Sequence, residues 1–362
     1  MKLLFVGTSR GNGGRENHFP TLARAMADAG HTVAAVVYPD GLIHDRLAGS
    51  SVRLYGGSFR NAMDPGGMLA VWKSAREFRP NWIVGCFSKE YWPVTIISEV
   101  LRVKLALFKQ MDFPMRPLTH YFIPRLADKF IVVSSFMLER FAVLGIAPHR
   151  MQILYNPIDL GHFRPDPDLR CRTREALGVG TDEILVGFVG SMHHGKGIFL
   201  LAEALNQVMV QIPSVKALWI GDGPSREELM LLLKSGVHDK RHIRLAWTAD
   251  VREYYAAMDI LAMPSIGPDT FGRVSIEAQA CGVPVLGSNV GGIPETMESG
   301  VTGLLLPSGD VSAWRDGILA LACDVQKRSA LAEEGRHWVA ERFDTKVIAR
   351  RFTELLEENH KE

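Results

Sequence analysis

A lysine after a glycine-rich turn is the first residue of this chain whose context suggests chemistry. Residues 190–197 read G-S-M-H-H-G-K-G, close to the P-loop pattern G-x-x-x-x-G-K-[ST]. Gly197 stands where the magnesium-binding hydroxyl residue of a P-loop belongs, so a magnesium-dependent nucleoside triphosphatase is disfavoured. Lys196, at the start of a predicted helix, can still bind a phosphate as a point charge. The alternative is a solvated surface lysine.

Two carboxylates lie eight residues apart in the most informative stretch, residues 264–282, which read P-S-I-G-P-D-T-F-G-R-V-S-I-E-A-Q-A-C-G. We predict a helix that starts near Phe271, with Glu277 about two turns in and Asp269 in the preceding loop. Amides of the loop and first turn can bind a diphosphate or sugar hydroxyls. Glu277 can accept hydrogen bonds from a ribose diol. The alternative is that Asp269 caps the helix and Glu277 is solvated.

A third glycine-rich segment, G-N-G-G at residues 11–14, follows a predicted strand and precedes a predicted helix. Glycines there let the backbone approach an anion at the helix N-terminus. A tight turn with nothing bound is equally compatible with the pattern. Glu16 stands where the third glycine of G-x-G-x-x-G belongs, which disfavours a Rossmann dehydrogenase.

Metal ligands are not suggested by the sequence. The adjacent His193 and His194 have no carboxylate or cysteine partner at metal-ligand spacing. The cysteines form no Cys-x-x-Cys pair, so neither a zinc site nor a disulfide framework is indicated, and a reducing compartment fits. They are Cys86, Cys171, Cys281 and Cys323. We expect no metal and no cofactor.

The elements that must position these residues alternate along the chain. We predict strands at residues 3–6, 33–37, 82–84 and 130–133, and again at 184–189, 217–220, 260–263 and 283–286. Helical patterns between them predict parallel strands with crossover connections. Prolines and charges without periodicity predict a linker over residues 157–182.

The predicted fold is therefore α/β, with two doubly wound parallel-sheet (Rossmann-like) domains facing across a cleft. We place the first domain at residues 1–160 and the second at 161–344, with a C-terminal helix over 345–362 packing back on the first. Ligands of such sheets bind at the carboxyl ends of the strands, so the cleft is the expected active site.

Read together, these segments resemble glycosyltransferase family 4, whose members are retaining enzymes of GT-B fold. The resemblance spans most of the chain and is most specific over residues 264–295. It rests on Gly13-Gly14 followed by Glu16, Gly190 with Lys196-Gly197, Asp269-Thr270-Phe271-Gly272, Glu277-Ala278, Ala280, Gly282, Pro284-Val285 and Gly291-Gly292-Ile293-Pro294-Glu295.

Three departures from the family pattern stand out. Ser191 replaces the family arginine, so diphosphate binding must depend on Lys196, backbone amides and Arg273. Asp269 replaces the first glutamate of the E-x7-E pair. The histidine of a strand end in the first domain is missing from residues 109–112, where Asp112 is the first candidate substitute and His120 the second.

The resemblance implies metal-independent transfer with retention, from a UDP- or GDP-linked sugar to a glycan or lipid-linked acceptor in polysaccharide, lipopolysaccharide or glycolipid synthesis. The first domain would take the acceptor, with Asp112 and His120 on that side, and the second would bind the nucleotide sugar. Implied catalytic residues are Asp269, Lys196 and Asp112. Implied donor-binding residues are Gly13, Gly14, Gly190, Ser191, Lys196, Phe271, Gly272, Arg273, Val274 and Glu277. The alternatives are a sugar-nucleotide epimerase of GT-B-like fold and a non-catalytic nucleotide-sugar binding protein.

The charge and the apolar runs of the sequence limit which kinds of partner are expected. The net charge of the 362 residues is +1, so nothing calls for nucleic acid, but residues 1–160 carry 19 Lys and Arg against 12 Asp and Glu. Basic and apolar residues mix over 72–79 and 101–105, which suits an anionic membrane surface as well as ordinary buried faces. No apolar run approaches the ~18 residues of a membrane span. We expect a cytoplasmic protein, with peripheral association at the inner face of the membrane left open.

Overall fold

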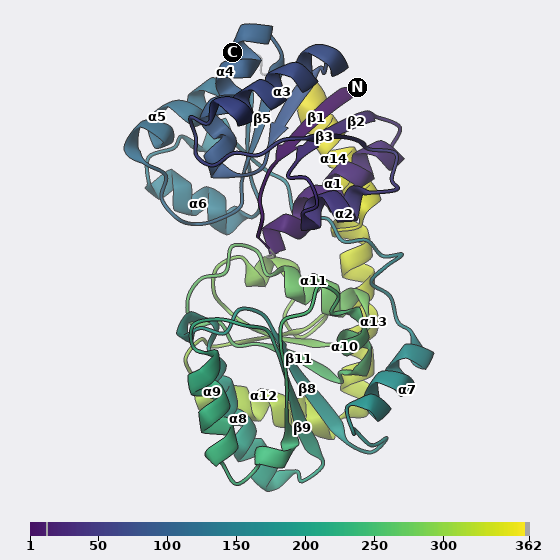
Figure 1. Cartoon of the computed structure of the whole chain (residues 1–362). Helices are drawn as coiled ribbons and strands as arrows, with labels where there is room; N and C mark the ends of the chain where they lie inside the picture. Colours follow the sequence, from purple (N-terminus) through teal and green to yellow (C-terminus); the bar gives the residue numbers. More distant parts are fainter. Residues whose placement is uncertain (12–13, 359–362) are drawn as a thin grey trace. The chain divides into compact units, whose positions relative to one another are not determined.

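The computed structural model describes residues 1–11 and 14–358, which fold as two compact units. The first unit comprises Met1–Pro157 and Phe343–Glu362, and the second comprises Ile158–Arg342. Each unit has a parallel sheet with helices on its two faces (Figure 1). The chain therefore has the predicted architecture of two doubly wound α/β sheets.

The sheet of the first unit has the strand order β3-β2-β1-β4-β5-β6-β7 within the described residues, all parallel. Apolar residues dominate the inner strands because both faces are covered by helices. The strands are β1 (Lys2–Gly7), β2 (Thr32–Val37), β3 (Arg53–Gly56), β4 (Trp82–Gly85), β5 (Lys104–Lys109), β6 (Lys129–Val132) and β7 (Met151–Ile153).

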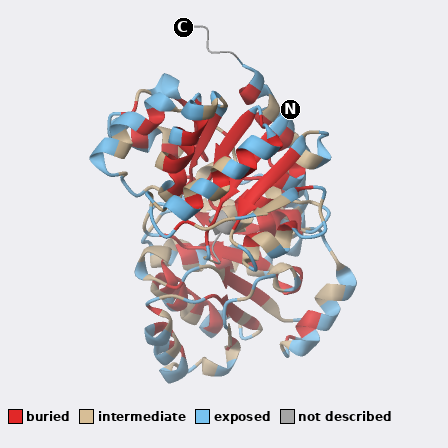
Figure 2. Cartoon of the chain, turned by 45° about the horizontal axis from the view of Figure 1, so that its top comes forward, coloured by how far each residue is buried: buried red, intermediate tan, exposed pale blue. Residues whose placement is uncertain are grey.

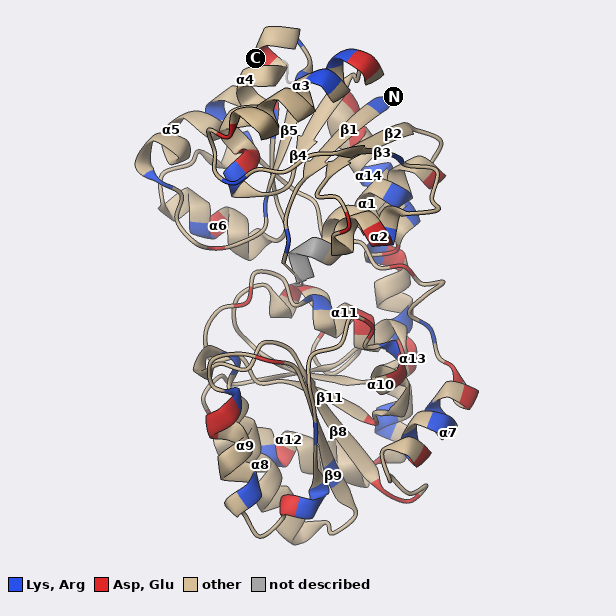
Figure 3. Ribbon diagram, in the orientation of Figure 1, with Lys and Arg blue, Asp and Glu red and all other residues tan. Residues whose placement is uncertain are grey.

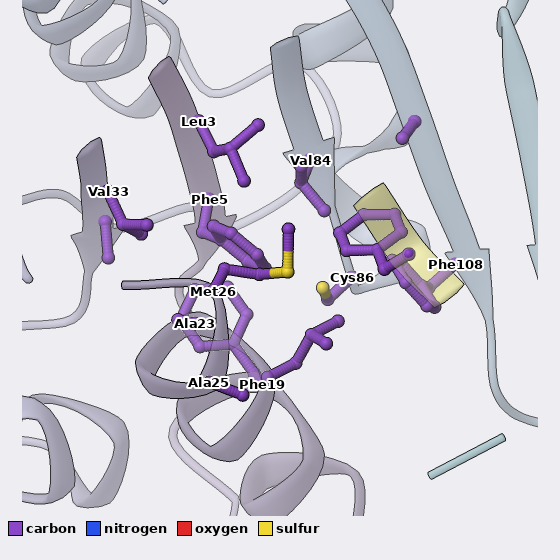
Figure 4. Close-up of a cluster of buried hydrophobic side chains, with 14 of the residues drawn as sticks. Leu3, Phe5, Phe19, Ala23, Ala25, Met26, Val33, Val84, Cys86 and Phe108 are labelled. Carbon is purple, nitrogen blue, oxygen red and sulfur yellow. The ribbon is translucent and has the colours of Figure 1, made fainter. Parts of the chain in front are cut away.

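Helices α1, α2 and α14 pack together over one part of this sheet, while α3, α4 and α5 pack in sequence elsewhere on it (Figure 1). The core beneath α1 contains Phe5 and Phe19, whose rings meet edge to face at 5.6 Å, and Phe108, which contacts Phe352 of α14 (Figure 4). The helices are α1 (Gly14–Asp28), α2 (Leu42–Leu47), α3 (Pro65–Phe78), α4 (Tyr91–Leu101), α5 (Pro117–Leu126), α6 (Ser135–Val143) and α14 (Thr345–Glu357).

The sheet of the second unit has the order β10-β9-β8-β11-β12-β13 in the described residues. Its strands are β8 (Ile184–Val189), β9 (Val215–Ile220), β10 (His242–Leu245), β11 (Ile260–Met263), β12 (Val285–Ser288) and β13 (Leu304–Leu306). Its helices are α7 (Pro167–Ala176), α8 (Ile198–Gln211), α9 (Arg226–Ser235), α10 (Arg252–Ala257), α11 (Arg273–Ala280), α12 (Val311–Cys323) and α13 (Val325–Arg342). Most residues of the inner strands of both sheets are buried, with exposed or half-buried residues mainly at the strand ends (Figure 2).

The predicted linker over residues 157–182 is partly wrong, because it contains helix α7. Asp166 caps this helix by accepting the N–H of Leu169 at 2.9 Å, and Pro167 occupies its first turn. Arg170 and Arg174 then bind Asp259 beyond the end of α10, at 2.6 and 2.9 Å. The prolines and charges of this segment are therefore capping and anchoring groups of an ordered helix.

The segments 72–79 and 101–105, in which basic and apolar residues mix, bury part of their apolar surface. Phe78 and Leu105 are buried, at 6% and 1% exposed, because α3 and β5 direct them into the core. Trp72 is covered by the guanidinium of Arg76, 5.0 Å from its ring centroid. The burial of Phe78 and Leu105 fits the alternative of ordinary amphipathic elements.

Candidate functional site

Lys196 and Asp269 form an ion pair at the switch point of the second sheet. β8 and β11 are neighbours, and the chain continues from β8 to β9 on one side and from β11 to β12 on the other. Lys196 ends a short 3-10 helix after β8, and Asp269 lies in the loop after β11. Because ligands of open α/β sheets bind at such a switch point, the pair lies where a ligand is expected.

Close backbone contact holds the two loops together. Gly197 has φ +66°, and a Cβ at this position would lie 1.8 Å from the carbonyl oxygen of Pro264. The carbonyl oxygen of Gly195 accepts the N–H groups of Ile266 and Gly267, both at 2.9 Å. Packing therefore requires a glycine where a P-loop would have its magnesium-binding hydroxyl.

The Gly291-Gly292 pair supports Asp269 from a third loop. The N–H of Gly292 donates to the carbonyl oxygen of Asp269 at 2.7 Å. Gly291 has φ +60°, and a Cβ there would lie 2.3 Å from the same oxygen. The two glycines thus fix the backbone of Asp269, and with it the carboxylate that faces Lys196.

Glu277 is buried and engaged on both carboxylate oxygens. One oxygen accepts from Nε of Arg273 at 2.7 Å, and the other accepts from the hydroxyl of Tyr255 at 3.0 Å. The Glu277 side chain is 7% exposed, so the alternative of a solvated carboxylate is wrong. Burial and the nearby Glu277 charge raise the pKa of the Tyr255 hydroxyl, which therefore stays a proton donor.

Helix α11 begins at Arg273, two residues later than predicted, because Phe271 is buried outside the helix and Gly272 adopts φ +96°. Glu277 consequently lies one turn into the helix, on the same face as Arg273. No side chain of the described residues caps the helix, so amides near Val274 remain for an anion. Arg273 has a buried Nη1 without a hydrogen-bond partner in the described part of the chain.

The loop after β8 carries less positive charge than the family pattern, because Ser191 stands in place of the family arginine. Ser191 is exposed, and Gly190 donates its N–H to the carbonyl of Ile220 at 3.0 Å. Burial and the neighbouring Lys196 lower the pKa of His193, so this ring adds little positive charge. His194 faces Glu228 at 3.4 Å on the surface. Across residues 1–11 and 14–358, no group of three His, Cys, Asp or Glu side chains suits a metal ion.

The predicted site residues of the first unit do not form a cluster like that of Lys196, Asp269 and their neighbours in the second unit. Gly14 is the first residue of α1, while Gly13 lies outside the described residues. Asp112 is half-buried in the loop after β5, near the buried Lys109, whose pKa burial lowers to about 8. His120 lies 2.8 Å from the carbonyl oxygen of Leu144, so its ring helps to hold the end of α6.

Sequence reasoning missed Tyr255 as a partner of Glu277. The two residues are separated by 22 positions and lie on different helices. No pattern in the sequence marks this tyrosine, because its role arises only where α10 and α11 meet.

These sheets, with a lysine–carboxylate pair at the switch point of the second, define a GT-B fold. The model of "Glycosyltransferase Family 4" matches residues 12–162, and that of "Glycosyl transferases group 1" matches residues 183–324. The two matches together cover most of the chain, which belongs to glycosyltransferase family 4.

Curated relatives carry two related descriptions. A GDP-mannose-dependent alpha-(1-6)-phosphatidylinositol monomannoside mannosyltransferase of Mycolicibacterium smegmatis is 30% identical over 239 residues, 64% of this chain and 62% of that protein. A D-inositol 3-phosphate glycosyltransferase of Saccharomonospora viridis is 28% identical over 297 residues, 77% of this chain and 67% of that protein. The matched segment thus spans about two thirds or less of these relatives.

Solved structures match nearly the whole chain. Anabaena HepE, in complex with UDP and glucose, has a TM-score of 0.83 and 25% identity, covering 98% of this chain and 99% of its own. A glycosyltransferase of Rickettsia africae has a TM-score of 0.84 at 18% identity, covering 99% of both chains, and shares the fold.

Proposed function

We propose that this protein transfers a sugar from a nucleoside-diphosphate donor to an acceptor with retention of anomeric configuration. The observation that carries the proposal is the Lys196–Asp269 pair at the switch point, next to the uncapped start of α11. A cation and helix amides together suit a departing diphosphate, whereas a carboxylate beside them suits sugar hydroxyls.

Lys196 keeps donor capacity in this arrangement. An ammonium has three N–H donors, and Asp269 takes one of them. The remaining donors can bind diphosphate oxygens, so the ion pair pre-positions the lysine rather than blocking it. Asp269 then orients ring hydroxyls of the donor sugar, and Arg273 with the α11 amides replaces the missing arginine at Ser191.

Glu277 is proposed to hold the donor ribose. A carboxylate has about four lone-pair sites, and Arg273 and Tyr255 occupy two of them. The others can accept the vicinal hydroxyls of a ribose.

The donor base is proposed to be uracil or guanine, since HepE was solved with UDP and the mycobacterial relative depends on GDP-mannose. The acceptor is proposed to be a glycan or lipid-linked glycan bound by the first unit. Asp112 is the better acceptor-side candidate, because the His120 ring is already engaged with the carbonyl of Leu144.

Peripheral association with anionic lipid is proposed through α5 and the loop before it. Large apolar side chains are exposed here, with few acidic residues on α4 and α5 (Figure 3) and with Arg116 and Arg125 among them. The exposed apolar residues are Met111, Phe113, Leu118, Tyr121, Phe122 and Leu126. No helix among the described residues is long and apolar enough to cross a membrane.

A thermal-shift screen with UDP, GDP and ADP, each beside its nucleoside monophosphate, tests the donor class. We expect one diphosphate to raise the melting temperature more than its monophosphate, because the site reads the second phosphate. A chain that none of the three stabilises would contradict the proposal.

A further inference from the structure

The face of α11 that points away from Arg273 carries buried polar side chains. Ser275 lies about 200° around the helix axis from Arg273, and Gln279 lies one turn further along the same face. Both side chains contact Thr296, the last residue of the short 3-10 helix Ile293–Thr296. All three residues are 0% exposed, and none belongs to the motifs that carry the family resemblance.

The side-chain amide of Gln279 joins the two elements directly. Its Nε2 donates to the carbonyl oxygen of Thr296 and to Oγ of Ser275, both at 2.9 Å. Because a carbonyl oxygen can only accept, the contact with Thr296 determines which end of the amide is the nitrogen. The amide therefore uses both of its N–H groups to hold α11 against the 3-10 helix.

Two hydroxyls extend this contact into a network. The Thr296 hydroxyl lies 2.8 Å from Oγ of Ser275 and 2.7 Å from the carbonyl oxygen of Ile293. Oγ of Ser275 thus has the amide of Gln279 on one side and the Thr296 hydroxyl on the other. Removal of any member leaves another buried polar group without its partner, so the three side chains act as one unit.

Packing alone is a poor account of this network. Buried polar groups must be hydrogen-bonded to avoid a desolvation cost, yet Oε1 of Gln279 has no hydrogen-bond partner in the described part of the chain. This oxygen faces Gly335 of α13, where a Cβ would lie 3.0 Å from it. A methionine would fill the space without an unpaired oxygen. Hydrogen bonds supply what an apolar residue lacks, because their directions fix the rotation of α11 about its axis.

The network connects to both carboxylates of the candidate site. It anchors α11, whose other face carries Glu277. It also anchors the 3-10 helix that follows Gly292, and the N–H of Gly292 donates to the carbonyl oxygen of Asp269 at 2.7 Å. The rotation of α11 therefore sets where the Glu277 carboxylate lies relative to Asp269.

We propose that this network locks α11 so that the ribose held by Glu277 and the sugar held by Asp269 are aligned for cleavage of the bond to the diphosphate. Ser275, Gln279 and Thr296 are positioning residues, since at 0% exposure they act through α11 and not by contact with the donor. The inference rests on the proposed function for its donor, whereas the network itself is a property of the second unit alone. A displacement of about 1 Å between reacting groups can cost about 100-fold in rate, so a small rotation is enough to matter.

Thr296→Val tests the network with little change of shape, because valine replaces only the hydroxyl with a methyl group. Thr296→Ser keeps the hydroxyl and is the rescue variant. Gln279→Met removes both N–H donors at similar volume and provides an independent test if Thr296→Val does not fold. Thr95→Val is the matched control, because the buried Thr95 hydroxyl donates to the carbonyl oxygen of Tyr91 within its own helix in the first unit.

The first measurement is amide hydrogen exchange of the peptide covering residues 273–282 in the full chain. We expect about 10-fold faster exchange in Thr296→Val and in Gln279→Met, with wild-type protection in Thr296→Ser and Thr95→Val. Unchanged exchange in the two test variants would overturn the inference, as would a Thr296→Ser variant that exchanges as fast as Thr296→Val.

The second measurement is release of nucleoside diphosphate from UDP-glucose and from GDP-mannose. For Thr296→Val and Gln279→Met we expect kcat to fall about 10- to 100-fold with KM for the donor nearly unchanged. The double variant should lose no more than the more affected single variant, because both changes break the same network.

A rise in KM alone, an unchanged kcat in folded Thr296→Val, or an equal fall in Thr95→Val would overturn the positioning role. If wild-type protein released no diphosphate while the exchange result held, the proposed function would fall and the locking of α11 by the network would stand.

Discussion

At the scale of single residues, neighbouring groups hold one lysine and two carboxylates of the candidate site in place. Gly197, Gly291 and Gly292 fix the backbone around Lys196 and Asp269, whereas Arg273 and Tyr255 fix Glu277. Each side chain is pre-organised before a ligand arrives, which is the usual requirement for electrostatic stabilisation of a leaving group.

Lys196→Ala should weaken binding of nucleoside diphosphate more than that of nucleoside monophosphate. A charge-assisted contact contributes about 1.5–3 kcal/mol, so the diphosphate Kd should rise about 10- to 100-fold. Calorimetric titration measures both ligands. Lys216→Ala is the matched control, since Lys216 pairs with Glu183 near the start of β9 and should leave both affinities unchanged. Equal losses for the two ligands in Lys196→Ala would show that this lysine does not read the diphosphate.

Glu277→Gln should abolish most turnover with a ribonucleotide donor, because the acceptor charge toward the ribose is lost. The structure adds a cost in stability that a solvated glutamate would not have, since Arg273 loses its buried partner. Tyr255→Phe keeps the ion pair and should reduce turnover far less. Kinetics and melting of both variants separate the two effects, and normal turnover by a folded Glu277→Gln would refute the assignment.

Asp269→Ala should mainly lower kcat, since sugar orientation matters most in the transition state.

At the scale of elements, β10 contains a buried histidine that links the fold to pH. His242 Nδ1 accepts the indole N–H of Trp219 at 3.1 Å, so the proton resides on Nε2, which faces Asn206 at 3.3 Å. Burial, helped by Arg244, lowers the pKa of His242 to about 4. Protonation of Nδ1 would break the bond from Trp219.

The free energy of unfolding should therefore fall as pH falls from about 6.5 to about 4. The unfolded chain takes up this proton near its ordinary pKa, whereas the native chain resists until about 4. The difference corresponds to about 3 kcal/mol at about 1.4 kcal/mol per pH unit. His242→Gln should lack this part of the pH dependence in urea unfolding at pH 7 and pH 4.5. An identical pH slope for both proteins would rule out the assignment.

Elements also show where sequence reasoning succeeds. The inner strands were predictable because residues buried on both faces form continuous apolar runs, as in β1 and β8. Helix α7 was not, because its order depends on Asp259, far along the chain. Motif spacing identified Lys196, Asp269 and Glu277 as candidates, because their motifs are local in the sequence. It gave no sign of Tyr255 or of the contact between Gln279 and Thr296, because each contact joins segments that are not adjacent in the sequence.

At the scale of the whole molecule, the question is which surface of the first unit combines the excess basic residues of 1–160 with exposed apolar side chains. Residues 72–79 and 101–105 expose no large apolar side chain, whereas α5 and the loop before it expose several beside Arg116 and Arg125. Arg125 stacks 4.0 Å from the ring centroid of Tyr121, as a basic–aromatic surface for lipid would.

Sedimentation with anionic vesicles should therefore deplete the protein at low salt and less so at high salt, because the Debye length is ~10 Å at 0.1 M and shorter above. Neutral vesicles should bind less. Leu118→Ser combined with Tyr121→Ser should reduce binding, whereas Leu231→Ser, at an exposed leucine of α9, should not. Equal sedimentation with neutral and anionic vesicles at low salt would point to a soluble acceptor.

The proposed function requires that this chain breaks the bond between a sugar and a nucleoside diphosphate at the Lys196–Asp269 site. Proton NMR of the chain incubated with UDP-glucose, and separately with GDP-mannose, follows this bond directly. We predict that one donor releases its nucleoside diphosphate, that the liberated sugar first appears with the donor's anomeric configuration, and that Lys196→Ala slows the release at least about 10-fold. Release that is equally fast in Lys196→Ala, or absent with both donors on long incubation, would contradict the account.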